Sequence, residues 1–372
     1  MARTLKRLEA AWKRLLMRTL SGVLRRSRAP ADAPEWDARP YRVLYLRYDR
    51  IGDMIMATGL IRGIAQSHPT IQLDVLASPL NAPVLEGNPY VRSVLTFDRR
   101  RGSSFRGALA TLRKRRYDVV IDGMVLTPSV TTLMLMLATG ARYRIGIGGR
   151  SNDFIYTLPV APAAPDAHQI EQSAVTAVPF GVDVATTDWR PEIFLSPPEL
   201  SAAERRWETG RLGTAPRWTR LLVNVSVTLA HRLWPEERYV ALLRHVRDRW
   251  PELRTVVVGS PGDRPRLARI AVAAGAEAVD TPHLRDALAL VGTADVVFTP
   301  DTSIAHAASA LRKPAVVMLV AGSSRFAPYA AAGRALYSEG PTLESLPLAP
   351  VISAVDEMVA RAQVRAPQSV AG

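Results

Sequence analysis

The chain has 372 residues, of which 48% are hydrophobic, and a formal net charge of +14 from 48 Lys and Arg against 34 Asp and Glu. This apolar fraction is large enough to form a core, which excludes an intrinsically disordered protein. The sequence contains no cysteine, which excludes disulfide scaffolds and Cys-ligated metal sites. The length predicts two domains or one large one. The charge predicts an anionic partner, either nucleic acid, an anionic membrane surface or a phosphorylated substrate.

Much of the positive charge lies in residues 1–28, which hold nine basic residues and one acidic residue. Apolar residues recur there at steps of three and four, which predicts a basic amphipathic helix. Charges interrupt its apolar stretches, so it cannot span a bilayer. Two interpretations stay open: a solvated surface helix, or an interfacial helix on an anionic membrane with Trp12 at the headgroup level. Residues 29–40, with three prolines, are predicted to be a linker.

Beyond this linker, strand-like and helix-like segments alternate in two series. The first series has strands at 42–47, 73–77, 91–97 and 118–122 and helices at 54–66, 105–115 and 130–138. The second has strands at 221–225, 255–258, 296–299 and 315–319 and helices at 235–249, 264–274, 284–291 and 303–311. Such alternation predicts two parallel α/β sheets, with ligands bound outside the carboxyl ends of the strands.

The predicted organisation has four segments, with the domain junction placed near residues 185–219. They are the basic helix and linker (1–40), an N-terminal Rossmann-like domain (41–200), a C-terminal Rossmann-like domain (201–345), and a C-terminal helix and tail (346–372).

The strongest candidate for a binding loop is Thr299-Pro-Asp-Thr-Ser-Ile-Ala-His306, between an apolar strand and a helix. Asp301 or Thr302 would be the N-cap, and the open helix start with the hydroxyls of Thr302 and Ser303 suits a diphosphate. His306 follows one turn after Thr302 on the same helix face. The alternative is an ordinary capping sequence with a packed core histidine.

A second candidate is Asp49-Arg50-Ile51-Gly52-Asp53, directly after the first strand. Gly52 would permit a tight strand-to-helix turn, and Asp53 would lie at the helix start. A carboxylate placed there can act as a general base towards a hydroxyl group. The alternative is a helix-capping carboxylate.

Two further loops follow strands of the second series. In segment 226–235, Arg232 could bind phosphate oxygens through two N–H groups, Ser226 and Thr228 add hydroxyl donors, and Pro235 is predicted as the first helical residue. A basic surface loop is equally compatible with this segment. In segment 258–263, Asp263 could accept hydrogen bonds from ribose hydroxyls, although a turn aspartate without a ligand is more frequent.

Together these motifs resemble glycosyltransferase family 9, the lipopolysaccharide heptosyltransferase family. The resemblance rests on Ile51-Gly52-Asp53, on Arg232-Leu233-Trp234-Pro235, and on Pro300-Asp301-Thr302-Ser303 with His306, supported by segments 117–122, 140–146 and 313–319. It covers roughly residues 42–345 and leaves the basic N-terminal helix outside.

The resemblance implies a GT-B fold, in which two Rossmann-like domains face each other across a cleft. It further implies a metal-independent, inverting transfer of a sugar, typically heptose from ADP-heptose, to a lipopolysaccharide-core or related glycan acceptor, without a cofactor. Such an enzyme would be cytoplasmic, and the interfacial interpretation of the basic helix would place it at the inner face of the cytoplasmic membrane.

Site residues carry over from the family position by position. Asp53 matches the proposed general base, Arg232 stands where a phosphate-binding lysine is usual, and Asp263 lies near an acidic ribose ligand. The diphosphate-binding helix start corresponds to Thr302, Ser303 and His306, with Asp301 beside the donor sugar. This chain has Ser303 where the family usually has glycine, and Asn224-Val225-Ser226 where a glycine-containing turn is usual.

A second basic cluster lies in segment 98–116, which holds eight basic residues and one acidic residue. We expect either that it faces phosphate groups of a lipid-linked acceptor or that it is a solvated helix face.

Three other functions remain open on sequence alone. A family member could bind a nucleotide sugar without catalysis. A nicotinamide-dependent oxidoreductase is disfavoured because the only glycine-rich candidate, Gly146–Ser151, lacks the third glycine of the dinucleotide motif. A nucleic-acid-binding protein is disfavoured because no nucleic-acid motif is present and the charge is concentrated in an amphipathic helix.

Overall fold

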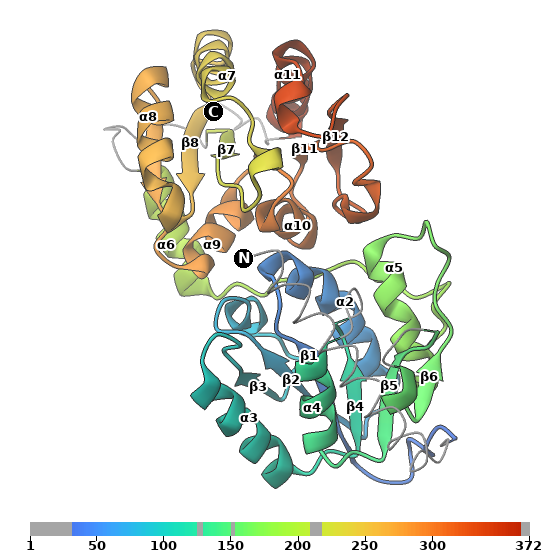
Figure 1. Ribbon diagram of the computed structural model, residues 1–372. Coiled ribbons are helices and arrows are strands. Elements are labelled where there is room, and N and C mark those ends of the chain that lie inside the picture. Colours follow the sequence, from blue (N-terminus) through green and yellow to red (C-terminus); the bar gives the residue numbers. More distant parts are fainter. Residues whose placement is uncertain (1–31, 125–128, 150–152, 209–217, 366–372) are drawn as a thin grey trace, which may run out of the picture. The chain divides into compact units, whose positions relative to one another are not determined.

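The computed structural model describes residues 32–124, 129–149, 153–208 and 218–365. These residues form two compact units, which divide between Trp189 and Arg190. Each unit is an α/β fold built on one parallel six-stranded sheet (Figure 1). The basic amphipathic helix predicted over residues 1–28 lies outside the described residues.

The first unit has the strand order β3-β2-β1-β4-β5-β6, with every pair parallel. Its strands are β1 (Tyr41–Arg47), β2 (Ile71–Ala77), β3 (Ser93–Thr96), β4 (Val119–Asp122), β5 (Tyr143–Ile147) and β6 (Leu158–Val160). Its helices are α2 (Ile51–Ser67), α3 (Gly102–Arg115), α4 (Val130–Ala138) and α5 (Gln169–Ala174). The helices α3 and α4 pack together, as do α2 and α5, so that the sheet is covered on both faces (Figure 1).

The second unit repeats this architecture, with the order β12-β11-β10-β7-β8-β9. Its strands are β7 (Arg220–Asn224), β8 (Arg254–Gly259), β9 (Glu277–Asp280), β10 (Val296–Pro300), β11 (Ala315–Leu319) and β12 (Gly333–Tyr337). Its helices are α6 (Pro197–Glu208), α7 (Glu236–Arg249), α8 (Arg264–Ala274), α9 (Leu284–Thr293), α10 (Ser303–Ala310) and α11 (Leu348–Arg365). Buried residues of α7, α8 and α11 form one core with the sheet, and α6 packs against α9.

Both sheets reverse their strand order at one point. In the first unit the chain builds β1, β2 and β3 towards one edge and then returns to place β4 beside β1. In the second unit β10 returns in the same way to lie beside β7. The loops after two such strands diverge to opposite faces of the sheet and leave a crevice at its carboxyl edge, which is where ligands bind in open α/β sheets. This geometry selects the loops after β1, β4, β7 and β10.

The strands and helices predicted from the two series are confirmed, but several elements escaped prediction. These are β5, β6, β9, β12 and α5. Three of these strands have weak hydrophobic patterns because they are edge strands. β6 is at one edge of the first sheet, and β9 and β12 are the two edges of the second. An edge strand is short and half solvated, so it lacks the continuous apolar run of a central parallel strand.

The segment predicted as a linker is packed where it is described. Trp36 is buried, stacks on Phe180 with ring centroids 4.4 Å apart, and donates from its indole N–H to the carbonyl of Pro179 at 2.8 Å. Residues 32–40 therefore pack against the first unit through Trp36. The ring on which Trp36 stacks, that of Phe180, lies far away in the sequence.

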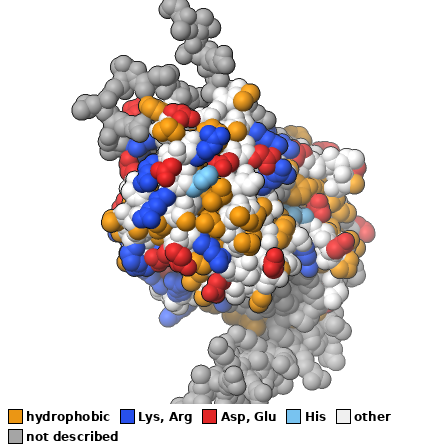
Figure 2. Space-filling model, turned by 90° about the horizontal axis from the view of Figure 1, so that it is seen from above, with side chains coloured by type: hydrophobic (Ala, Val, Ile, Leu, Met, Phe, Trp, Pro, Cys, Tyr) orange, Lys and Arg blue, Asp and Glu red, His pale blue; other side chains and the backbone are white. Residues whose placement is uncertain are grey.

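Acidic and basic side chains are interspersed on the face seen from above in Figure 2. Surface ion pairs of the second unit follow this pattern, including Arg269–Glu236 at 2.6 Å and Arg334–Glu357 at 2.8 Å.

Among the described residues, no helix is long and apolar enough to cross a membrane.

One buried carboxylate organises the edge of the first sheet. Asp74 on β2 is fully buried and accepts hydrogen bonds from Arg92 at 2.8 and 2.9 Å, Arg115 at 3.1 Å and Tyr117 at 2.7 Å. Burial opposes the ionisation of Asp74, but the hydrogen bonds from Arg92 and Tyr117 outweigh it and lower its pKa. Asp74 thereby joins β2, β3 and the end of α3.

We expect Asp74→Asn to lower the free energy of unfolding by about 2 kcal/mol at pH 7, because several donors lose a charged acceptor. A lowered folded-state pKa stabilises the protein above the unfolded-state pKa of about 3.9. The loss should therefore disappear as the pH falls through the folded-state pKa. Urea unfolding at several pH values measures this dependence.

The matched control is Asp280→Asn, which breaks an exposed ion pair with Arg264. An exposed pair contributes less than about 1 kcal/mol. Equal losses in the two variants would contradict the central position assigned to Asp74.

Candidate active site

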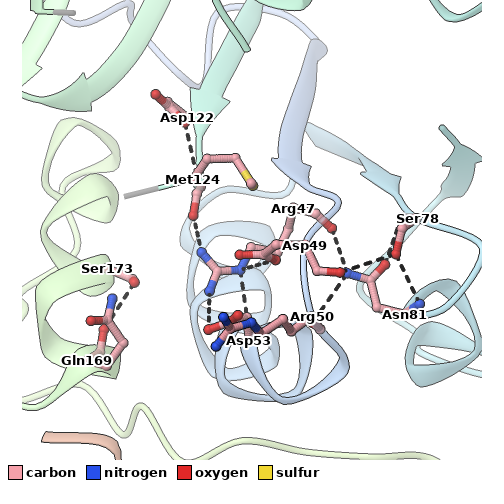
Figure 3. A network of polar contacts seen from close by, with 11 residues as sticks. Arg47, Asp49, Arg50, Asp53, Ser78, Asn81, Asp122, Met124, Gln169 and Ser173 are labelled. Carbon is pink, nitrogen blue, oxygen red and sulfur yellow. Dashed lines mark hydrogen bonds and ion pairs between the residues drawn. The ribbon is translucent and has the colours of Figure 1, made fainter. Parts of the chain in front are cut away.

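In the first unit, a buried arginine contacts several polar groups at the strand-order reversal (Figure 3). Arg47 ends β1 and is 2% exposed. Its guanidinium contacts the carboxylates of Asp49, Nε to Oδ1 at 3.2 Å, and of Asp53, Nη2 to Oδ1 at 3.1 Å. It also donates to the backbone carbonyls of Asp53, at 3.2 Å, and of Gly123. Arg47 therefore connects the loops after β1 and β4 to the first turn of α2.

The charged groups in this cluster shift one another's pKa values. Burial disfavours the charged form of Arg47, but Asp49 and Asp53 outweigh it and raise the pKa of the guanidinium. Burial also raises the pKa of Asp49 to about 6, with a further contribution from the negative charge of Asp53 and an opposing one from Arg47. Carboxyl groups with a raised pKa are found preferentially at functional sites.

Neutral polar groups from the loop after β2 hold the backbone of this cluster. The Asn81 amide Nδ2 donates to the carbonyl of Arg47 at 3.1 Å and to that of Arg50 at 3.4 Å, while its Oδ1 accepts from the backbone N–H of Ser78 at 2.8 Å. Asn81 is fully buried. The connection between β1 and α2 is therefore fixed from both sides.

A further buried carboxylate ends β4. Asp122 is 3% exposed, accepts from the Tyr156 hydroxyl at 2.6 Å and accepts from the backbone N–H of Met124 at 2.9 Å. Both partners fix the turn after β4, so Asp122 shapes the second loop of the crevice.

The structure does not place Gly52 in the strand-to-helix turn, where it was predicted. The connection from β1 to α2 consists of residues 48–50, and Gly52 is already the second residue of the helix. Gly52 is not among the glycines with positive φ. Asp53 lies in the first helical turn, and Arg50 occupies the N-cap position. The carboxylate of Asp53 therefore contacts Arg47 and does not cap the helix.

In the second unit, one carboxamide joins the corresponding loops. Asn224 ends β7 and is 2% exposed. Its Nδ2 donates to the hydroxyls of Thr299, at 2.9 Å, and Thr302, at 3.1 Å, and its Oδ1 accepts from the backbone N–H of Ser226 at 3.1 Å. Thr302 is the N-cap of α10 and accepts from the N–H of Ile304 at 3.3 Å. The start of α10 is thus fastened to the end of β7.

Arg232 and Asp301 meet at the same place. The Arg232 Nη2 lies 2.9 Å from Oδ2 of Asp301, and Nη1 donates to the Asp301 carbonyl at 2.8 Å. The Asp301 side chain is 3% exposed, whereas that of Arg232 is 21% exposed. Asp301 therefore orients a guanidinium that still reaches solvent beside the N-terminus of α10.

The loop after β8 joins this cluster through hydroxyl groups. The backbone N–H of Ser260 donates to the Ser226 hydroxyl, and the Ser260 hydroxyl donates to Oδ2 of Asp263 at 2.6 Å. Asp263 is the N-cap residue of α8. The structure thus brings Ser226, Arg232, Asp263, Asp301 and Thr302 together at the carboxyl ends of β7, β8 and β10.

The other predicted donor residues occupy distinct positions. Ser303 is the first residue of α10 and partly exposed, His306 is a buried residue of α10, and Thr228 is exposed in the loop after β7. Pro235 is the N-cap of α7 and not its first helical residue, so that prediction was wrong by one position. These placements assign no function, and the roles of all predicted site residues stay predictions.

Several residues of the two clusters were not predicted as site residues. Arg47, Asn81, Asp122 and Tyr156 were missed, whereas Asp49, Asn224 and Thr299 were named in the sequence motifs without a role. Arg47 and Asp122 carried a usable signal, because a charged residue at the end of an apolar strand must find a partner when buried. Asn81 and Tyr156 carried none, since their positions depend on loops that meet only in the folded sheet.

Two successive Rossmann-like units are the architecture of GT-B proteins, and this chain has that fold. A model of glycosyltransferase family 9 (heptosyltransferase) matches residues 106–341, more than half of the chain. The chain belongs to this family, and it is a glycosyltransferase. The resemblance inferred from the sequence motifs is thereby confirmed.

Known proteins agree with this assignment. The chain is 23% identical over 348 residues to lipopolysaccharide heptosyltransferase 3 of Escherichia coli, covering 83% of this chain and 96% of that protein. It resembles the crystal structure of a family 9 glycosyltransferase from Veillonella parvula, with a TM-score of 0.77, 16% identity and coverage of 89% and 100% of the two chains. It also resembles E. coli ADP-heptose lipopolysaccharide heptosyltransferase II, with a TM-score of 0.70, 18% identity and coverage of 87% and 99%.

Proposed function

We propose that this glycosyltransferase transfers heptose from ADP-heptose to a lipopolysaccharide-core or related glycan acceptor, with inversion at the anomeric carbon and without a metal ion. The observation that carries the proposal is the cluster of Asn224, Arg232, Asp301 and Thr302 at the strand-order reversal of the second sheet. ADP-heptose is the choice of donor because it appears in the name of the structurally similar E. coli enzyme.

The cluster of the second unit suits a nucleoside diphosphate. The N-terminus of α10 offers backbone N–H groups and a partial positive charge, and Thr302 and Ser303 add hydroxyl groups. Arg232, oriented by Asp301, supplies a guanidinium that stabilises negative charge as the diphosphate leaves. Asp263 follows on the neighbouring loop and is our candidate for the ribose hydroxyls, with Ser226, Thr228 and His306 as further donor contacts.

The cluster of the first unit suits proton abstraction. Asp53 is our candidate for the general base, which takes the proton of the acceptor hydroxyl as its oxygen attacks the anomeric carbon. The attack occurs opposite the departing diphosphate and therefore inverts the configuration. Arg47 holds Asp53 in place by contacting both its carboxylate and its backbone carbonyl oxygen.

The basic cluster of segment 98–116 divides into two groups. Arg115 is bound to Asp74 and Ser93 within the sheet edge, so we assign it a structural role. The other seven basic residues are exposed: Arg99, Arg100, Arg101, Arg106, Arg113, Lys114 and Arg116. We propose that this exposed group faces phosphate groups of the acceptor.

The function is tested by incubating the purified protein with a panel of nucleotide sugars and a lipopolysaccharide-core acceptor, with and without EDTA. We expect a product heavier by one heptose only with ADP-heptose, with the anomeric configuration inverted in its NMR spectrum and the same yield in EDTA. Donor binding without any product would instead indicate a catalytically silent member of the family.

Replacing Asp53 by asparagine should abolish the chemical step and preserve donor binding. The amide cannot accept the hydroxyl proton, so we expect kcat to fall by about 10²-fold or more. Calorimetry should give an unchanged Kd for ADP-heptose. Asp183→Asn, which changes an exposed aspartate of the same unit, is the matched control. Turnover retained in Asp53→Asn would remove Asp53 from the role of base.

Replacing Arg232 by alanine should weaken donor binding. A charge-assisted hydrogen bond contributes about 1.5–3 kcal/mol, which corresponds to roughly a 10- to 100-fold higher Kd for ADP-heptose. The control is Arg269→Ala, an exposed arginine of α8 that pairs with Glu236. Equal affinities of Arg232→Ala and the unaltered protein, measured by calorimetry, would contradict phosphate binding by Arg232.

We propose further that residues 1–28 bind the enzyme to the anionic inner face of the cytoplasmic membrane. Nine basic residues at about 1 kcal/mol each give ample attraction to an anionic leaflet. The full chain should float with liposomes that contain anionic lipid, and a variant lacking residues 1–28 should not. Flotation of both variants, or retention of the full chain on DNA instead, would overturn this proposal.

A further inference from the structure

One feature of the first unit is not used by the proposed reaction. The guanidinium of Arg47 is shared between two carboxylates, and only one of them, Asp53, is assigned to catalysis. Asp49 lies four residues earlier, with its side chain 22% exposed and its Oδ1 at 3.2 Å from Arg47 Nε. The Arg47 guanidinium thus contacts two carboxylates directly.

We propose that Asp49 is a positioning residue of the transfer reaction: it shares Arg47 with Asp53 and so keeps Asp53 able to accept a proton. The proposal rests on the proposed function, in which Asp53 is the base.

The physical reason lies in the opposing effects of the two neighbours. Arg47 orients Asp53, but a positive charge within about 4 Å also stabilises the ionised carboxylate and makes it a poorer proton acceptor. The negative charge of Asp49 offsets this effect. An arginine with two carboxylates therefore fixes the base and leaves it reactive, which an isolated Arg47–Asp53 pair would not do.

The other charged or titratable groups around the cluster supply less of this offset. Asp122, from β4, accepts a hydrogen bond from the Tyr156 hydroxyl at 2.6 Å, and its negative charge acts on Arg47 less strongly than that of Asp49. Tyr45, from β1, is fully buried, and burial raises its pKa to about 12, so it is neutral at working pH. From the loop after β2, Asn81 and Ser78 contribute only neutral groups.

Asp49 is also held in a state that reduces the stability of the fold. Because its folded-state pKa of about 6 lies above the ordinary value, its contribution to stability is complete below pH 3.8 and is lost as the pH rises through 6. At neutral pH the ionised Asp49 therefore destabilises the protein. A carboxylate kept at such a site is expected to serve activity and not folding.

The test compares the pH dependence of transfer by Asp49→Asn with that of the unaltered protein. Without the negative charge of Asp49 beside Arg47, the acid limb of kcat/KM should move to lower pH by about one unit. The plateau of kcat should fall by about tenfold, because a weaker base transfers the proton more slowly. The KM for ADP-heptose should stay within about twofold.

Two controls separate this role from a structural one. The melting temperature of Asp49→Asn at pH 8 should equal or exceed that of the unaltered protein, and Asp49→Glu, which keeps the charge, should restore the position of the acid limb. Asp183→Asn should change neither quantity. An acid limb that stays in place in a folded Asp49→Asn variant would overturn the proposal.

A measurement without substrate keeps this inference distinct from the proposed function. In protein labelled with ¹³C at the Asp carboxyl groups, the Asp49 signal, assigned by its loss in Asp49→Asn, should titrate near pH 6. In Asp53→Asn the midpoint should fall by about one pH unit, because a neighbouring negative charge is removed. A midpoint unaffected by Asp53→Asn overturns the inference even if heptose transfer is established. Absence of heptose transfer, with this coupling intact, overturns the proposed function and leaves only the electrostatic coupling of Asp49 and Asp53 established.

Discussion

Parallel strand pairing is the constraint on which the rest of this molecule depends. Every strand of both sheets runs in the same direction as its neighbours, so each must be followed by a crossover, and all carboxyl ends lie at one edge. Where the strand order reverses, the two diverging loops leave that edge open. The polar clusters of the two units occupy this place because it is where backbone and side-chain groups are not already used by the sheet.

Charge burial is the second constraint, and two aspartates of the first unit satisfy it in different ways. Asp74 is fully buried but surrounded by donors, which lowers its pKa and makes it a stabilising link. Asp49 shares its one guanidinium with Asp53, and its pKa is raised. Two aspartates of one sheet therefore make opposite contributions at neutral pH, and this difference separates a structural carboxylate from one associated with the site.

The second unit shows how side chains join the loops at the carboxyl edge of its sheet. The Asn224 carboxamide binds Thr299, Thr302 and the backbone of Ser226. Arg232 contacts both the carboxylate and the carbonyl of Asp301. Its planar guanidinium can bind both groups at once, which a single ammonium group would do with less defined geometry.

The sequence by itself determined the alternation of strands and helices, the family, and the loops that hold the candidate site. Central parallel strands are continuous apolar runs and the motifs directly follow them, so local sequence is sufficient for both. The tertiary structure alone decided the edge strands β6, β9 and β12, the burial of Trp36, and the sharing of Arg47 between Asp49 and Asp53. Each of these depends on groups brought together by folding, and the pKa of a carboxyl group is set by those neighbours and not by its position in the sequence.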